Sequence, residues 1–222
     1  IATVAFGARV VAGDVYHEGI SGITVADIEF AADLQHCIKL LAVVEQTRAS
    51  DGGLQIGVRV HPTLVPLDHP LASVRGSFNA VFVEGGASGD LMFYGRGAGG
   101  RPTASAVLGD LIDAASNLRR GHGAPIGALE RARIAPIDDV TSAFYLNVEV
   151  DDRPGVLAQV ATVFGENGVS IRSMEQEGLG GEARLVFITH AARERDLRST
   201  LQGLRSLDAV RAVGSVLRVI GD

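Results

Sequence analysis

The second half of the chain alternates strand and helix patterns in an order that few folds satisfy. The predicted elements are, in order, a strand at 144–150, a helix at 155–167, strands at 169–177 and 183–190, a helix at 192–206 and a strand at 210–220. Pro154 is compatible with the first turn of the first helix, since the N–H that proline lacks has no helical partner there. Asn167 and Gly168 favour the left-handed backbone conformation that ends a helix, so this helix is expected to end there. This βαββαβ order, in about 80 residues, predicts a ferredoxin-like domain.

The strand at 144–150 predicts which of its side chains are buried. Apolar and more polar residues alternate along it, as in a strand with one face on a core. We expect four side chains to face inward and three to face solvent: Phe144, Leu146, Val148 and Val150 inward, and Tyr145, Asn147 and Glu149 outward.

The first half of the chain mixes helices and strands. Thr24 and Asp27 have the spacing of a helix cap, which predicts a helix over about 25–36. The apolar, β-branched residues 37–45 either extend this helix or form a strand. The other elements expected are a half-buried strand at 54–62, a hairpin of strands at 78–85 and 90–95, and a helix at about 103–120. Residues 121–142, with several Gly and Pro, predict a linker that holds a short helical turn at 128–132.

A glycine-rich loop joins the hairpin to the helix that follows it. Gly95, Gly97 and Gly100 form G-x-G-x-x-G between a predicted strand and a predicted helix, the spacing of a dinucleotide-binding loop. Glycines let backbone approach a phosphate, and free N–H groups at a helix start carry partial positive charge. The rest of a Rossmann unit is absent, because no second strand and no ribose-binding acidic residue follow. Two interpretations stay open: a tight turn, or a loop that contacts a nucleotide held mainly by another domain.

The residues 151–157, DDRPGVL, lie at a predicted strand-to-helix junction. Free N–H groups at the helix start suit a ligand carboxylate, and Asp151 or Asp152 suits an ammonium group. An amino acid carries both groups. The alternative is a capped helix start that binds nothing.

Other candidate sites are weaker. His61, His69 and Asp68 lie near one another in sequence, but a metal site needs three or four convergent ligands, so we predict no metal. His17 and Glu18 fit a solvated polar turn better than acid–base chemistry. Cys37 is favoured as a buried structural thiol, and no G-x-S-x-G motif supports a serine hydrolase.

Composition excludes several classes of function. The net charge of −6 argues against a nucleic-acid surface. Lys39 is the only lysine, so any mechanism that needs a lysine has to use it or a residue outside this chain. No uninterrupted apolar stretch reaches about 18 residues, so we predict no membrane span. The single cysteine fits a reducing compartment, the cytoplasm. The chain begins with Ile1, so we expect it to be the later part of a longer protein, cut within an element.

Taken together, these residues resemble the homoserine dehydrogenase family with a C-terminal ACT domain. The resembling segments are 5–10, 14–24, 38–45, 58–85 and 92–111 in the first half, and 151–171 and 184–190 in the second. The first set, which includes MFYGRGAGGRPTASAVLGDL, is specific to the enzyme. The second set identifies an ACT domain, which many enzymes of amino-acid metabolism carry.

The resemblance implies an α+β fold in three parts. These are a mixed-sheet catalytic and dimerisation domain at 1–121, incomplete at its N-terminus, a linker at 122–142, and a ferredoxin-like βαββαβ ACT domain at 143–222. Enzymes of this family interconvert aspartate semialdehyde and homoserine by hydride transfer with NADPH or NADH, in threonine, methionine and isoleucine biosynthesis. Their Rossmann domain, acidic substrate ligands and catalytic lysine would precede Ile1. Lys39 does not match that lysine, so we assign no catalytic residue and expect the chain alone to be inactive.

The resemblance also implies binding sites. The loop 95–99 would contact the nicotinamide side of NADP or NAD, which assigns cofactor binding to Gly95, Gly97 and Gly99. Asn79 lies in a shared motif without an assigned role. An amino-acid effector, threonine by its place as end product, would bind between ACT domains of a homodimer or higher homo-oligomer. The effector would lie near Asp151, Arg153, Pro154 and Gly155 of one copy and near residues 167–170, which include Asn167, at the interface between copies. The rival hypothesis is a non-enzymatic, amino-acid-binding regulatory protein.

Overall fold

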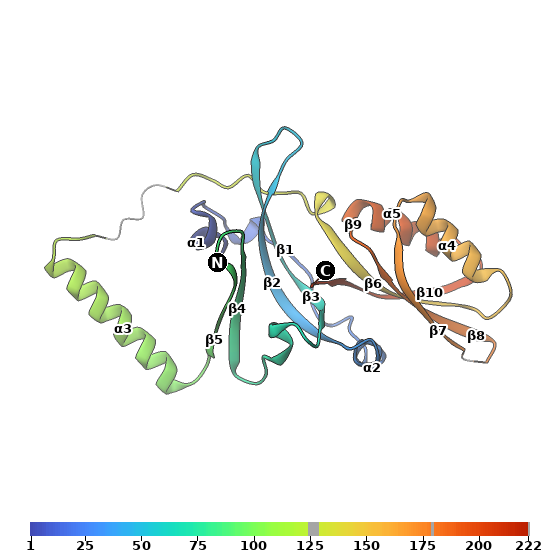
Figure 1. The fold of residues 1–222 in the computed structure, drawn as a ribbon, viewed down its shortest axis with the longest axis horizontal. Helices are drawn as coiled ribbons and strands as arrows, with labels where there is room; N and C mark the ends of the chain where they lie inside the picture. Colours follow the sequence, from blue (N-terminus) through green and yellow to red (C-terminus); the bar gives the residue numbers. More distant parts are fainter. Residues whose placement is uncertain (124–128, 179, 222) are drawn as a thin grey trace. The chain divides into compact units, whose positions relative to one another are not determined.

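The chain divides into two compact units that do not follow its order in sequence. The computed structural model describes residues 1–123, 129–178 and 180–221, and Figure 1 traces them. One unit combines residues 1–66 with 131–222, and the other holds residues 67–130. The first unit joins both ends of the chain because a strand near the C-terminus pairs with one from the first 66 residues. The domain boundaries predicted at residues 121 and 143 are boundaries between family domains, which differ from these compact units, and they stay a prediction.

The helices and strands alternate as expected for an α+β chain. The α-helices are α1 (Ala2–Phe6), α2 (Val25–Asp33), α3 (Gly100–Arg119), α4 (Val156–Glu166) and α5 (Glu194–Arg205). The strands are β1 (Tyr16–His17), β2 (His36–Arg48), β3 (Leu54–Pro66), β4 (Phe78–Gly85), β5 (Gly89–Arg96), β6 (Thr141–Asp151), β7 (Ile171–Gly178), β8 (Glu182–Thr189), β9 (Ala192–Arg193) and β10 (Val210–Val219). Short 3-10 turns lie at Ala12–Asp14, Pro70–Ser73 and Ile137–Asp139.

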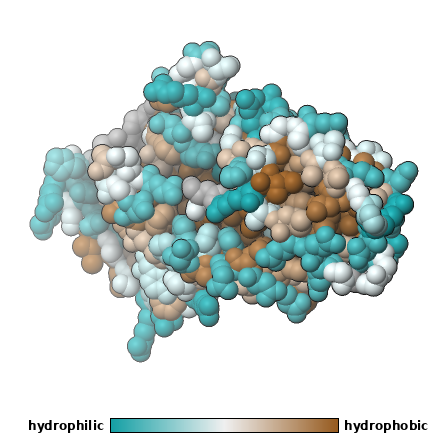
Figure 2. All heavy atoms as spheres, turned by 45° about the vertical axis from the view of Figure 1, so that its right-hand side comes forward, coloured by the Kyte–Doolittle hydropathy of each residue, from teal (hydrophilic) through white to brown (hydrophobic). Residues whose placement is uncertain are grey.

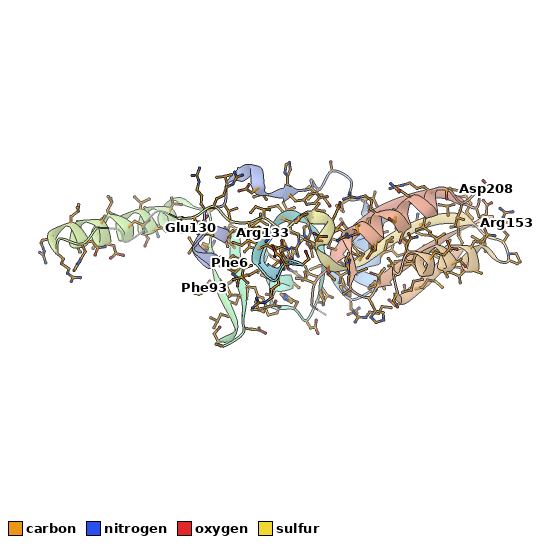
Figure 3. The ribbon with its side chains drawn as sticks, turned by 90° about the horizontal axis from the view of Figure 1, so that it is seen from above. Phe6, Phe93, Glu130, Arg133, Arg153 and Asp208 are labelled. Atoms are coloured by element: carbon orange, nitrogen blue, oxygen red, sulfur yellow. The ribbon has the colours of Figure 1, made fainter. Side chains whose placement is uncertain are left out.

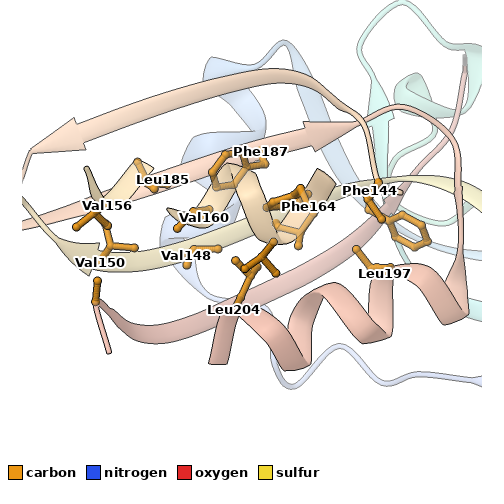
Figure 4. Packing of buried hydrophobic residues seen from close by; sticks show 14 of the residues in the cluster. Phe144, Val148, Val150, Val156, Val160, Phe164, Leu185, Phe187, Leu197 and Leu204 are labelled. Atoms are coloured by element: carbon orange, nitrogen blue, oxygen red, sulfur yellow. The ribbon is translucent and has the colours of Figure 1, made fainter. Parts of the chain in front are cut away.

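The predicted βαββαβ order of the second half is confirmed. The strands lie in the order β10-β6-β8-β7, all antiparallel, with α4 and α5 between them in sequence. Figure 4 shows the apolar core between this sheet and the two helices. The four side chains predicted to face inward from β6 belong to this core, packed with others from α4, β8 and α5: Phe144, Leu146, Val148, Val150, Val160, Phe164, Leu185, Phe187 and Leu204.

The opposite face of β6 is also covered, so the prediction that Tyr145 and Asn147 face solvent is wrong. Both residues are buried, and Tyr145 is fully so. A second apolar cluster on this face brings Tyr145 together with Ala31 of α2 and with side chains of β3, β8 and β10. Strict alternation predicts one buried face, but a helix from the first part of the chain covers the other.

The ambiguous segment 37–45 forms a strand. It belongs to β2, which pairs antiparallel with β3 in unbroken register from His36↔Pro66 to Arg48↔Leu54. The helix before it, α2, begins at the predicted cap, where Thr24 Oγ1 accepts the Asp27 N–H at 3.2 Å. It ends at Asp33, three residues earlier than predicted.

Strand β3 is buried on both faces, so the prediction of a half-buried strand is wrong. Its polar residues are buried as well as its apolar ones, among them Arg59, His61 and Thr63. Arg59 tolerates burial because Glu45 of β2 accepts its Nη1–H at 2.5 Å. Besides β2, β3 pairs in parallel with β1 and with β10, and the pairing with β10 extends the sheet of the second half into the first part of the chain.

The segment before β6 packs within the first unit. Short parallel bridges join Arg9 to Arg131 and Ile56 to Ile134, and the Ala132 N–H donates to Arg9 O at 2.9 Å. The helical turn predicted at 128–132 is therefore wrong for residues 129–132, which are not helical and include the bridge residue Arg131. Residue 128 lies outside the described residues.

The second unit holds the predicted hairpin and helix. Strands β4 and β5 pair from Phe78↔Arg96 to Gly85↔Gly89, and α3 begins at Gly100, before the predicted start at 103. No described residue of α3 is buried. Several apolar residues of α3 are exposed, among them Leu108, Leu111 and Ile112. Figure 2 shows hydrophobic and hydrophilic atoms intermixed on the face of the molecule that it draws.

Candidate functional site

The glycine loop leaves β5 and runs into α3. Gly95 still belongs to β5, where it pairs with Asn79 of β4. The Gly97 N–H donates to the Ser77 carbonyl at 3.1 Å, so the loop stays attached to the hairpin for one more residue. Gly99 is the N-cap of α3, with φ 123° and ψ 144°.

Two glycines of this loop are required, each for a different reason. At Gly99 the positive φ is one that side-chain-bearing residues rarely adopt. At Gly97 the reason is space, because a Cβ atom built there would lie 1.8 Å from Asn79 Nδ2. At Gly95 and Gly100 a Cβ would meet no atom within 4 Å, so these two positions present bare backbone to open space.

The start of α3 is suited to an anion. It has no side-chain cap and no acidic residue in its first turn, and the exposed Arg101 lies there instead. A cation at the positive end of a helix dipole is unfavourable by itself and becomes favourable when an anion binds between them. Residues 99–101 therefore suit an anionic group, because the backbone carries no side chain at the two adjacent positions 99 and 100.

The predicted effector residues Asp151, Arg153, Pro154 and Gly155 lie together at the start of α4. Arg211 Nε donates to Asp151 Oδ1 at 2.8 Å, and Arg153 lies 3.2 Å from its other oxygen. The hydrogen bond from Arg211 is the main cause that holds the pKa of Asp151 below its usual value. Gly155, at φ 90°, is the N-cap of α4 and offers no side-chain cap.

This junction lies beside the loop before β10. The Asp151 N–H donates to the Ala209 carbonyl at 2.9 Å. Figure 3 shows Arg153 and Asp208 projecting from this same end of the first unit. The site around Asp151 thus already holds two arginines, so a ligand ammonium group there has to compete with them.

Asn167 lies at the other end of α4. Its Nδ2 donates to the Val163 carbonyl at 2.8 Å, which closes the last turn of the helix. An 11-residue helix is about 16 Å long. The structure therefore does not bring Asn167 and Asp151 together within one chain.

A buried charge network is the main feature that the sequence pattern missed. Arg218 of β10 donates to Glu18 Oε1 at 2.9 Å and to Glu194 at the start of α5. The guanidinium lies 5.3 Å from the centre of the Tyr16 ring, and the Tyr16 hydroxyl donates to Glu18 at 2.5 Å. The hypothesis of a solvated turn is therefore wrong for Glu18. No local signal could have found this network, because its members lie up to 200 residues apart.

The network shifts the pKa values of its own carboxylates and of the nearby His61. Burial opposes ionisation of Glu18, but the Tyr16 hydroxyl and Arg218 outweigh it and lower its pKa. For Glu194, burial outweighs Arg218 and raises the pKa. His61, almost fully buried, has its pKa lowered to about 4 by burial and by the charge of Arg218.

The candidate metal ligands His61 and His69 each have a partner within their own unit. His61 Nδ1 lies 3.1 Å from the Pro62 carbonyl, and His69 Nδ1 accepts the Leu71 N–H at 3.1 Å. Among the described residues, no group of three or more His, Cys, Asp or Glu side chains is placed to hold a metal ion.

A cavity of about 220 Å³ lies in the first unit between β3 and the segment before β6. Its walls are mainly apolar, and its polar side chains already have partners: Asp14 accepts the Val11 N–H, Tyr16 donates to Glu18, and Arg59 donates to Glu45. With these groups occupied, the cavity has little to orient a polar ligand.

Comparison with sequence families decides the relationship. The model of the family described as homoserine dehydrogenase matches residues 1–112, half of the chain, and the ACT domain model matches residues 144–209. The chain belongs to the homoserine dehydrogenase family. The resemblance stated from the sequence is confirmed, as is the ACT domain within an α+β fold.

Curated homoserine dehydrogenases match the whole chain. The protein of Corynebacterium glutamicum is 49% identical over 223 residues, which cover 100% of this chain and 50% of that protein. The protein of Mycobacterium tuberculosis is 46% identical over 228 residues, covering 100% of this chain and 52% of its own length. The chain thus spans about half the length of the curated relatives it matches.

Solved structures of the same family share the fold. A homoserine dehydrogenase from Thiobacillus denitrificans superposes with a TM-score of 0.89 at 34% identity, covering 99% of this chain and 50% of that one. A homoserine dehydrogenase from Staphylococcus aureus gives 0.68 at 26% identity, covering 100% of this chain and 51% of that one. Among the described helices, none has the length and apolar character needed to cross a membrane.

Proposed function

We propose that this chain supplies part of the catalytic and dimerisation domain, and the regulatory domain, of a homoserine dehydrogenase. The reaction is the interconversion of aspartate semialdehyde and homoserine in the biosynthesis of threonine, methionine and isoleucine. The observation that carries the proposal is the loop 95–101, where bare glycine backbone leads into an uncapped, cationic helix start inside the family match.

The glycine loop is proposed to contact NADP or NAD. When bound, the cofactor's nicotinamide gives or takes the hydride. The part of this chain is to bind and orient it: Gly99 and Gly100 allow close approach, and the free N–H groups of residues 100 and 101, with Arg101, attract an anionic group. Gly97 contributes by shaping the loop, since the Asn79 side chain occupies the space where a Cβ atom of residue 97 would lie. No residue of this chain is proposed to take part in the hydride transfer itself.

The ACT domain is proposed to bind an amino acid, threonine, as a feedback effector. The uncapped start of α4 at Gly155 suits the carboxylate of the amino acid. Asp151 suits its ammonium group, which would replace one of the arginines that now pair with Asp151. Because Asn167 lies at the far end of α4, it would contact an effector held by a second copy of the chain. This arrangement requires a homodimer or a larger homo-oligomer.

The single Cys37, which is free in the structure, supports a reducing compartment, and we assign the protein to the cytoplasm. The rival function is a non-enzymatic, amino-acid-binding regulatory protein. Only the ACT domain supports it, whereas the family match over residues 1–112 is to an enzyme.

Calorimetric titration separates the two functions. The chain is titrated with threonine and, separately, with NADPH, alone and after fusion to the half of the Corynebacterium relative that it does not match. Threonine binding supports the regulatory role under either hypothesis. A folded fusion that binds threonine but neither binds NADPH nor transfers hydride would favour the rival.

A further inference from the structure

We propose that Asn79 is a positioning residue, which holds the glycine loop in the shape that receives the cofactor. The inference rests on the proposed function of that loop and deepens it. All of the contacts involved lie within the second unit, between β4, β5 and the loop that follows β5.

The side chain of Asn79 lies directly on the backbone of Gly97. A Cβ atom built on Gly97 would be 1.8 Å from Asn79 Nδ2, 2.4 Å from Cγ and 3.0 Å from Oδ1. Residue 79 pairs with residue 95, so residue 97 is its diagonal neighbour on the same face of the hairpin. The carboxamide therefore occupies the volume that any side chain at position 97 would need.

A second restraint acts on the same residue. The Gly97 N–H donates to the Ser77 carbonyl at 3.1 Å. Beside it, the Arg96 guanidinium lies 4.8 Å from the centre of the Phe78 ring, which stacks on Tyr94 at 4.9 Å. The loop is thus fixed at Gly97 by one hydrogen bond and by one side chain packed against it.

This fixed point determines the backbone that follows. Gly99 lies two residues later at φ 123°, where glycine has more freedom than any other residue. Without a restraint at position 97, that freedom would let the loop sample other directions before α3. Asn79 removes the freedom before the cofactor binds, which lowers the entropic cost of binding.

A double-mutant cycle tests the contact. The variants G97A, N79A and N79A/G97A are made in the fusion with the unmatched half of the Corynebacterium relative. We expect G97A alone to raise the KM for NADPH about tenfold, because the added methyl group and the Asn79 side chain cannot share the space. In the N79A background the space is empty, so adding G97A should raise KM by less than about threefold.

The single variant N79A tests the role of Asn79 independently of the double-mutant cycle. It should raise the KM for NADPH and leave the unfolding temperature nearly unchanged, since Asn79 is an exposed residue. The matched control G109A lies in α3, where its Cβ would meet nothing within 4 Å, and its effects should add to those of N79A. If G97A does not fold, N79A alone and the comparison of N79A with N79A/G97A decide the proposal.

NMR of the 222-residue chain supplies a readout other than activity. In N79A the amide signals of residues 97–101 should shift and show larger fast motions than in the unchanged chain. Equal effects of G97A in both backgrounds, or an N79A variant with unchanged KM and unchanged loop signals, overturns the role of Asn79. If the unmodified fusion fails to bind NADPH, the proposed function fails, and the NMR signals still decide whether Asn79 holds the loop.

Discussion

Arg218 shows how a single residue joins distant parts of this chain. It is a buried cation between two carboxylates, Glu18 near the N-terminus and Glu194 at the start of α5. Burial of a charge is costly, and the network offsets the cost by pairing each charge with at least one partner. Sequence reasoning could identify Glu18 as a polar residue in a family motif, but it could not find a partner 200 residues away.

Replacing Arg218 should strongly destabilise the protein. In R218M the buried Glu194 and the partly exposed Glu18 lose their shared counter-charge, and Glu194 carries most of the cost, so we expect the free energy of unfolding to fall by about 3 kcal/mol. Urea unfolding followed by circular dichroism measures it. The matched control R198M breaks an exposed pair with Asp138 and should cost no more than about 1 kcal/mol. Equal losses in both variants would contradict the account of the network.

His61 should make stability depend on pH. Its pKa is about 4 in the folded protein and about 6.5 in an unfolded chain, so between these values only the unfolded chain binds the proton. The free energy of unfolding should therefore decline as pH falls from about 6.5 to about 4, by at most about 3 kcal/mol. In H61Q this part of the decline should disappear, whereas H17Q, at an exposed position, should keep it. An unchanged pH profile in H61Q would refute this role.

At the scale of elements, the order of strands and helices was predictable, but their surroundings were not. The βαββαβ order follows from local periodicity, and the caps at Thr24 and Gly168 follow from residue chemistry. The burial of Tyr145 and of the polar face of β3 depends on elements that pack from elsewhere in the chain. The same limit applies to Gly97: its motif was recognised, but the reason for the glycine lies in Asn79 on another strand.

The start of α4 offers a test at this scale. Gly155 has φ 90°, so G155A should lower the free energy of unfolding by about 1–2 kcal/mol. Gly165, in the same helix, has open space at its Cβ, and G165A should leave stability unchanged or raise it by about 0.5 kcal/mol. Thermal unfolding of both variants measures the difference. A G155A variant as stable as G165A would contradict the backbone geometry assigned to this cap.

At the scale of the whole molecule, the ACT sheet continues into the first part of the chain. β10 pairs with β3 through Arg218↔Thr63 and Val219↔Leu64, and α2 covers the face of the ACT sheet that α4 and α5 leave open. Sequence patterns predicted a linker between two domains at 122–142, and part of that segment, residues 131–135, packs within the first unit instead. Such long-range pairing has no local signature.

The most direct test of the account is hydride transfer, measured as homoserine-dependent reduction of NADP or NAD. The 222-residue chain alone should show no turnover, and its fusion to the unmatched half of the Corynebacterium relative should show turnover that threonine inhibits. Turnover by the chain alone, or a folded, dimeric fusion with no turnover, would contradict the account.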